Sequence, residues 1–169
     1  MQKYAFVDRD GTFLWEPKRP EDVDPRETFP LKNMDEFHFM DGAIEGLKAL
    51  TDKGYELVMV TNQTFLGTSK HPQEMFNAVM QRIYDELGAH DISFAFVMVC
   101  PHGPDEGCGC RKPKIGGLNG FLEKNKGNID FAHSLMFGDR DTDGQFARNL
   151  GVKFVRIETN RHFSVPEWV

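Results

Sequence analysis

The chain has 169 residues, of which 40% are hydrophobic and 27% charged, and its net charge at pH 7 is −6. This length and composition favour one globular domain, residues 1–169, with a substantial core. The negative charge argues against nucleic acid or an anionic membrane as the main partner, and no apolar run is long enough to span a membrane. No signal peptide is visible, which favours a cytoplasmic location.

Short apolar runs alternate with segments of helical periodicity along the chain. We predict strands at residues 4–7, 56–61, 94–99, 134–137 and 153–157, and helices at 42–53, 72–87, 117–126 and 142–150. Asp41 is the predicted N-cap of the first helix, and Gly54 its C′ residue. This alternation predicts a Rossmann-like, three-layer α/β/α fold with a central parallel sheet.

Two segments do not fit this alternation. Residues 14–40 contain four prolines, which exclude a continuous helix and predict an irregular insertion near the functional site. Residues 158–169 form a polar tail for which the sequence predicts no element.

The first predicted strand runs into the motif Asp8-Arg9-Asp10-Gly11-Thr12. Carboxylates two positions apart on an extended chain point the same way, and Gly11 permits a sharp turn after them. Such a pair can bind a divalent metal, or divide the roles of nucleophile and acid between its members. The alternative is an ordinary surface turn closed by glycine.

Polar motifs also follow the other predicted strands. Thr61-Asn62-Gln63 ends the second strand, Arg111-Lys112-Pro113 follows the third, and Gly138-Asp139-Arg140 ends the fourth. The carboxyl ends of parallel strands share one edge of the sheet, where ligands bind. The set suits phosphoryl transfer: Asp8 and Asp139 would hold Mg²⁺, and Thr61 and Lys112 would bind phosphoryl oxygens. Each motif alone has an ordinary structural explanation, but four in this order do not.

The three cysteines lie within eleven residues, together with one histidine. An odd number crowded into one loop does not indicate a disulfide framework. Three thiols and an imidazole make the closed tetrahedral ligand set of a structural zinc site, which we predict at Cys100, His102, Cys108 and Cys110. The alternative is a loop of free thiols with an incidental histidine.

Together, these motifs resemble in order those of haloacid dehalogenase-superfamily phosphatases, over residues 3–157. The cysteine loop resembles that of the zinc-containing branch, which holds the histidinol-phosphate and heptose-bisphosphate phosphatases. The short interval from His102 to Cys108, Leu66-Gly67-Thr68 and Glu16-Pro17 are most similar to the histidinol-phosphate type. Thr64-Phe65 departs from the Asp-Gly common in the family.

The resemblance implies a role for each matching residue. Asp8 would be the nucleophile that forms an aspartyl-phosphate, and Asp10 the general acid and then base. Asp8, the Asp10 backbone carbonyl and Asp139 would hold Mg²⁺, with support from Asp143. The remaining roles are phosphate binding by Thr61, Asn62, Lys112 and Arg111. From its charge and position we also expect Glu16 to meet the amine or imidazole of the substrate.

The expected function is therefore hydrolysis of a small phosphomonoester, histidinol phosphate, with catalytic Mg²⁺ and structural Zn²⁺. A sugar-bisphosphate phosphatase, such as one for heptose 1,7-bisphosphate, is the first alternative. A zinc-stabilised phosphate-binding module without catalysis is the second, although it would not require a nucleophile and an acid in register. The sequence leaves the oligomeric state open, with a monomer as one option.

Overall fold

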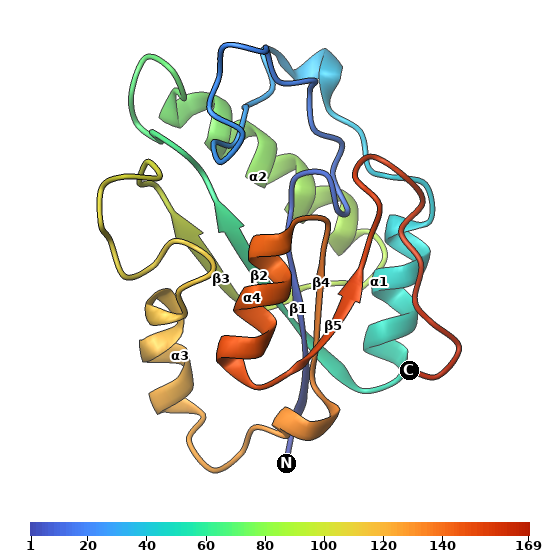
Figure 1. Ribbon diagram of the computed structural model, residues 1–169. Helices are drawn as coiled ribbons and strands as arrows, with labels where there is room; N and C mark the ends of the chain where they lie inside the picture. The colour runs from blue at the N-terminus through green and yellow to red at the C-terminus, as the bar shows by residue number, and fades with distance from the viewer.

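A computed structural model describes all of residues 1–169 and contains one five-stranded sheet (Figure 1). The strands are β1 (Lys3–Val7), β2 (Tyr55–Asn62), β3 (Phe94–Cys100), β4 (Leu135–Gly138) and β5 (Lys153–Arg156). They are all parallel, in the order β3-β2-β1-β4-β5. The predicted parallel sheet is confirmed. Because the chain moves outward from β1 in both directions, the ligand crevice of such a sheet is expected beside the carboxyl end of β1.

The helices cover both faces of the sheet (Figure 1). They are α1 (Ala43–Asp52), α2 (Gln73–Gly88), α3 (Asn119–Lys124) and α4 (Asp141–Leu150), with short 3-10 turns η1 (Met34–Glu36), η2 (Gly116–Leu118) and η3 (Phe131–His133). The pleat of β1 divides the core: Ala5 and Val7 pack with α1 and α2, whereas Tyr4 and Phe6 pack with α3 and α4. The three-layer prediction is confirmed.

The start of α1 differs from the prediction. Its N-cap is Gly42, with φ of 76°, and not Asp41. A β-carbon on Gly42 would lie 2.3 Å from Cε1 of His162, and the Phe163 amide donates to the Asp41 carbonyl at 2.8 Å. The C-terminal tail therefore packs against this turn and leaves room only for glycine. The predicted C′ residue, Gly54, is confirmed, with φ of 80°.

The two segments without a predicted element both reach the carboxyl edge of the sheet. The insertion at 14–40 is irregular apart from η1, as predicted. The tail has no helix or strand, but Phe163 is fully buried against Gly46 of α1 and Phe137 of β4. The predicted helix at 117–126 is shorter and splits into η2 and α3. None of the helices combines the length and apolar character that crossing a membrane requires.

Candidate active site

Asp8 is the first residue after β1, and Lys112 lies beside it. The Asp8 amide continues the sheet by donating to the Phe137 carbonyl at 2.9 Å. Its carboxylate Oδ1 lies 2.6 Å from Nζ of Lys112, which also lies 2.7 Å from Oδ1 of Asp143. All three side chains are buried. One ammonium group thus faces two carboxylates in a site that excludes most water.

Asp139 completes a cluster of three carboxylates. Ligand oxygens of Asp8, Asp139 and Asp143 all lie within 4.8 Å of one another. Burial raises the pKa of Asp8 well above its ordinary value of 3.8; Lys112 opposes this shift, and Asp143 and Asp139 add to it. Burial also raises the pKa of Asp139. Three carboxyl groups thus lie around a single ammonium group, and their hard oxygen donors fit Mg²⁺.

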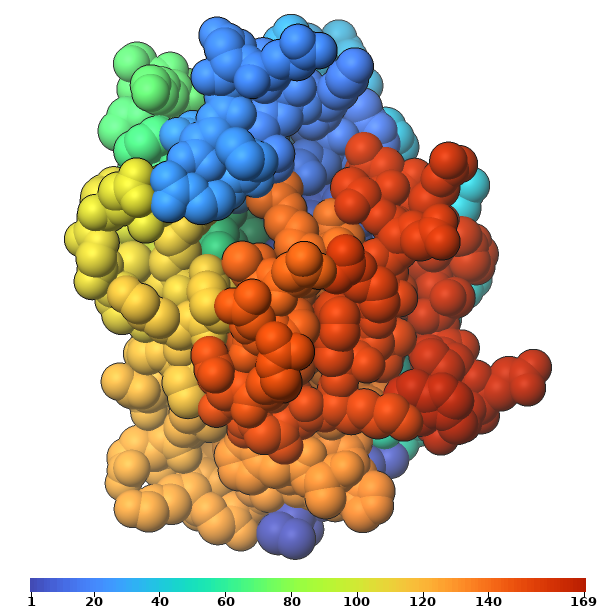
Figure 2. Space-filling model, in the orientation of Figure 1, coloured from blue at the N-terminus to red at the C-terminus, as the bar shows by residue number.

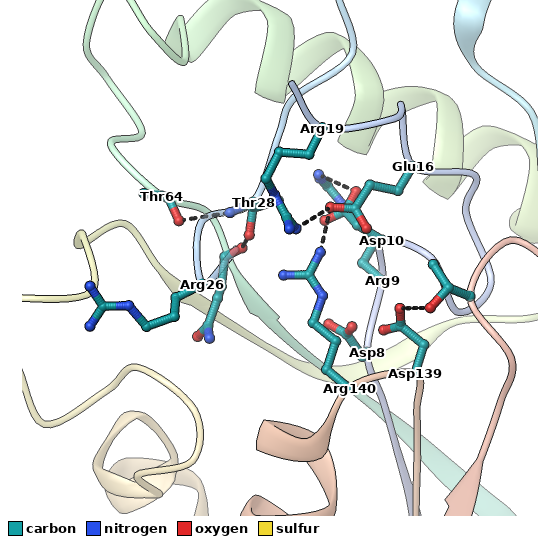
Figure 3. A network of polar contacts seen from close by, with 12 residues as sticks. Asp8, Arg9, Asp10, Glu16, Arg19, Arg26, Thr28, Thr64, Asp139 and Arg140 are labelled. Carbon is teal, nitrogen blue, oxygen red and sulfur yellow. Dashed lines mark hydrogen bonds and ion pairs between the residues drawn. The ribbon is translucent and has the colours of Figure 1, made fainter. Parts of the chain in front are cut away.

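Asp10 opens onto the same cavity as Asp8 but has different partners (Figure 3). Its carboxylate accepts hydrogen bonds from Nε of Arg9 at 3.0 and 3.1 Å and from Nε2 of Gln63 at 2.7 Å. The Thr61 hydroxyl is 3.5 Å from the same carboxylate and does not line the cavity. Thr61 thus lies behind Asp10, and its predicted contact with phosphate stays a prediction.

Gly11 brings the first motif close to the fourth. Its φ is 77°, and a β-carbon there would lie 2.6 Å from Oδ2 of Asp139. A larger residue would be strained in this conformation and would also displace the carboxylate. The glycine of the sequence motif is therefore required by close packing of the β1 loop against Asp139.

Asn62 ends β2 and holds the backbone of Lys112. Its Oδ1 accepts from the Lys112 amide at 3.0 Å, and its Nδ2 donates to the Lys112 carbonyl at 3.3 Å. Asn62 also lines the cavity. The second and third motifs are thus joined directly, and this pair of bonds fixes where the lysine side chain begins.

Arg111 joins three loops. Its guanidinium donates to the hydroxyl of Thr64 at 3.2 Å, to the carbonyl of His102 at 2.9 Å and to the carbonyl of Arg26. Desolvation lowers its pKa. The side chain is buried and borders the cavity, so the predicted phosphate contact stays a prediction beside these structural bonds.

Glu16 lies on the insertion, and its carboxylate points toward Arg19 and Arg140 (Figure 3). It is 5% exposed and forms ion pairs with Arg140 and with Arg19, whose Nη2 lies 3.7 Å away. Burial raises the pKa of Glu16, and Arg140 opposes this shift. The carboxylate that we expect to meet a substrate amine thus already forms ion pairs with two arginines.

These side chains line a cavity of about 980 Å³. Figure 2 shows its opening as a recess between the insertion in blue, the cysteine loop in yellow and the start of α4 in orange. The lining contains eight lysines and arginines and six acidic residues, although the whole chain is negatively charged. A locally basic cavity in an acidic protein favours an anionic ligand.

The cysteine loop brings its four predicted zinc ligands together. Sγ of Cys110 lies 3.3 Å from Sγ of Cys100 and 3.3 Å from Nδ1 of His102, and Sγ of Cys100 lies 3.7 Å from Sγ of Cys108. Thiolates around a tetrahedral zinc ion are about 3.8 Å apart, given Zn–S bonds of about 2.3 Å. The donor types and spacing therefore fit Zn²⁺, with no ligand position left open for substrate.

Several residues at the site were not singled out from the sequence. Gln63 was read only as part of a motif, yet it bridges Arg9 and Asp10. Thr159 and Asn160 come from the tail: the Thr159 hydroxyl donates to Asp139 at 2.7 Å, and the Asn160 amide binds the backbone of Glu16. No periodicity or motif marks the tail residues, so no sequence signal was available for them.

Known proteins are similar to this chain over most of its length. Residues 5–160 match the family model described as polynucleotide kinase 3 phosphatase. The histidine biosynthesis bifunctional protein HisB of Legionella pneumophila (strain Lens) is 38% identical over 159 residues, which are 93% of this chain and 42% of that protein. This chain thus spans about two fifths of the length of that relative.

Solved structures share the fold. The D,D-heptose 1,7-bisphosphate phosphatase of B. bronchiseptica, solved with magnesium and phosphate, superposes with a TM-score of 0.74 at 26% identity, over 94% of this chain and 82% of that one. A HAD-superfamily hydrolase from Ehrlichia chaffeensis superposes with a TM-score of 0.59 at 15% identity, over 96% and 94% of the two chains. The second likeness shows the fold alone.

Proposed function

This chain belongs to the polynucleotide kinase 3 phosphatase family of haloacid dehalogenase-like phosphatases, and on that premise we propose that it hydrolyses histidinol phosphate. The observation that carries the reaction type is the pair Asp8 and Asp10, which open onto one basic cavity with Nζ of Lys112 2.6 Å from Asp8. The 38% identity to HisB supports the substrate. The cytoplasmic location, the single domain 1–169 and the absence of a nucleic-acid partner stay predictions.

The chemistry begins with Asp8 as nucleophile. A carboxylate oxygen of Asp8 forms a bond to phosphorus while the bond from phosphorus to the substrate oxygen breaks, which leaves an aspartyl-phosphate. Asp10 gives its proton to the leaving oxygen as general acid. Hydrogen bonds from Arg9 and Gln63 orient Asp10 for this transfer.

Hydrolysis of the aspartyl-phosphate completes the cycle. Asp10, now ionised, removes a proton from water; the water oxygen bonds to phosphorus, and the bond to Asp8 breaks. Lys112 stays between Asp8 and Asp143 and binds phosphoryl oxygens through its remaining N–H group. Asp8, Asp139 and Asp143 are the side chains that would hold Mg²⁺, which supplies charge neutralisation when bound. The Asp10 carbonyl as a further ligand stays a prediction.

A second candidate function rests on the basic lining of the cavity. The solved relative acts, by its name, on a sugar bisphosphate. Lys18 and Arg19 line this cavity, and the ion pair of Arg19 with Glu16 is long, at 3.7 Å, so these two cations would suit a second phosphate. Arg26 also lines the cavity, but its guanidinium pairs with Asp24 and Asp105. Heptose 1,7-bisphosphate is therefore the alternative substrate.

The test is phosphate release with Mg²⁺ from four substrates: histidinol phosphate, heptose 1,7-bisphosphate, an aryl phosphate and a 3′-phosphorylated oligonucleotide. Preference for histidinol phosphate, lost in Asp8→Asn, would support both reaction and substrate. Preference for another of the four would retain the mechanism and overturn the substrate. If none of the four substrates releases phosphate in a reaction that depends on Asp8, a phosphate-binding module would be favoured instead.

A further inference from the structure

The tail that leaves β5 returns to the site and is fixed there by backbone bonds. The Ile157 amide donates to the Gly138 carbonyl at 2.9 Å, and the Asn160 amide donates to the Gly11 carbonyl at 3.0 Å. Residues 157–160 therefore bridge the loop after β4 and the loop after β1. These two loops carry Asp139 and Asp8.

Asn160 strengthens this bridge with its side chain. Its Oδ1 accepts from the Glu16 amide at 2.8 Å, and its Nδ2 donates to the Glu16 carbonyl at 2.7 Å. Asn160 has φ of 54°, a left-handed conformation that asparagine tolerates better than most residues. Together with the backbone bonds of Ile157 and Asn160, these bonds fix the chain on both sides of Thr159, whose position is therefore set by the fold.

Thr159 directs its hydroxyl at Asp139. Oγ1 of Thr159 donates to Oδ2 of Asp139 at 2.7 Å, while Oδ1 of Asp139 has only the Thr12 hydroxyl at 3.5 Å. Gly11 closes the other side, because a β-carbon there would lie 2.6 Å from the same Oδ2 and 3.1 Å from Cγ2 of Thr159. One oxygen of Asp139 is thus held by the protein, which restricts rotation of the carboxylate.

We propose that Thr159 is a positioning residue for the divalent cation, because it holds Asp139 in the orientation that faces Asp8 and Asp143. The inference rests on the proposed cation site but not on the identity of the substrate. Groups that orient a metal ligand by hydrogen bonding commonly change metal affinity by about 10- to 100-fold when they are removed. Thr159 touches no other member of the carboxylate cluster, so its effect passes through Asp139.

The test compares Thr159→Val, which keeps the shape and removes the hydroxyl, with Thr159→Ser, which keeps the hydroxyl. Mg²⁺ binding is measured by calorimetry on the protein without substrate, and the Mg²⁺ dependence of phosphate release is measured separately. We expect Thr159→Val to weaken Mg²⁺ binding about 10-fold, and Thr159→Ser to restore most of the affinity. At saturating Mg²⁺, the KM for substrate should stay at the wild-type value.

Thr51→Val is the matched control, since the Thr51 hydroxyl bonds only to the Lys48 carbonyl of its own helix, outside the cavity. Thr159 is exposed, so in the presence of a chelator Thr159→Val is expected to have the same melting temperature as the wild type. Wild-type Mg²⁺ affinity in Thr159→Val would overturn the proposal. So would a Ser variant as weak as the Val variant, because packing rather than the hydroxyl would then matter. Mg²⁺ binding without hydrolysis of any substrate would remove the proposed function and leave this inference in place.

Discussion

Two clusters of metal-ligand side chains lie in this chain, and they are assembled in opposite ways. Cys100, His102, Cys108 and Cys110 come from one stretch of eleven residues that begins at the end of β3. Asp8 and Asp139 instead follow two neighbouring strands more than a hundred residues apart, and Asp143 lies in the first turn of α4. The first cluster needs only local chain geometry. The second exists only after β1 and β4 have paired.

The two clusters also differ in their donor atoms. The loop offers soft sulfur and nitrogen donors that close around Zn²⁺, and it contributes Arg111 and Lys112 directly after the last ligand. The carboxylate cluster offers oxygen donors, is buried, and already contains one ammonium group from Lys112. We infer that the zinc loop serves to place Lys112 while the carboxylates serve the reaction. Damage to each cluster should therefore have a different consequence.

The largest effect is expected for Asp8→Asn. The amide keeps the size of the side chain and cannot form an aspartyl-phosphate, so phosphate release should fall by about 10⁴-fold or more. Folding should be retained, because the change removes a buried carboxylate whose pKa is already raised by burial and by Asp143 and Asp139. Phosphate release and a thermal melt measure the two effects. Residual activity near that of the wild type would show that Asp8 is not the nucleophile.

Cys108→Ser should have the opposite profile. Loss of one thiolate opens the closed ligand set, so bound zinc should drop below one per chain and the melting temperature should fall by roughly 5–10 °C, since structural zinc contributes folding free energy. Metal analysis and a thermal melt are the measurements. A wild-type protein purified with less than one zinc per chain and with full stability would contradict a structural zinc site. The cysteine cluster would then not differ from the carboxylate cluster by stabilising the fold.

The sequence predicted the parts of the site that depend on strand ends. Apolar runs identified all five strands, and the parallel order then placed Asp8, Asn62 and Asp139 at one edge. The zinc ligands followed from spacing alone. Lys112 was predicted from its place after the third strand, and its long side chain is buried between Asp8 and Asp143. The structure brings these residues together as local chain geometry and the topology of a parallel sheet lead one to expect, and their roles in the reaction stay predictions.

The remaining contacts could not be predicted, because they depend on how irregular segments lie on one another. Arg111 bonds to two carbonyls and a hydroxyl from three separate loops, and no pattern in the sequence reports such partners. The tail was predicted to form no element, and it forms none, but Thr159 and Asn160 still reach the site. The Asp41 cap was wrong for the same reason, since packing of the tail requires Gly42 at that turn.

Lys112→Met tests the link between the clusters. It leaves Asp8 and Asp143 buried without their ammonium partner, so the free energy of unfolding should fall by about 3–5 kcal/mol. Urea denaturation measures the loss. The double variant Lys112→Met with Asp143→Asn should recover part of it, because one uncompensated charge is removed. Lys48→Met is the control: its ion pair with Asp52 is exposed, so a loss of at most about 1 kcal/mol is expected. Equal losses in the two lysine variants would contradict this view of Lys112.

The smallest expected effect is a dependence on pH. In the folded protein, burial raises the pKa of Asp8 and of Asp139 above the ordinary value of 3.8, so folding retains protons there that the unfolded chain has already released. The contribution of these groups to the stability of the Mg²⁺-free protein should therefore decrease as pH rises from about 4 through their raised pKa values.

Mg²⁺ should reverse this trend, because it binds the ionised carboxylates and competes with protons. The rise in melting temperature on adding Mg²⁺ should be larger at about pH 8 than at about pH 5. Asp139→Asn should reduce the Mg²⁺-induced rise in melting temperature at the higher pH. Cys108→Ser should lower the melting temperature measured without Mg²⁺ but keep the Mg²⁺-induced rise, because the zinc ligands are separate from the carboxylates. If Cys108→Ser removed the Mg²⁺ response as well, the loop and the carboxylate cluster would be one cooperative unit, and Lys112 would be the residue that couples them.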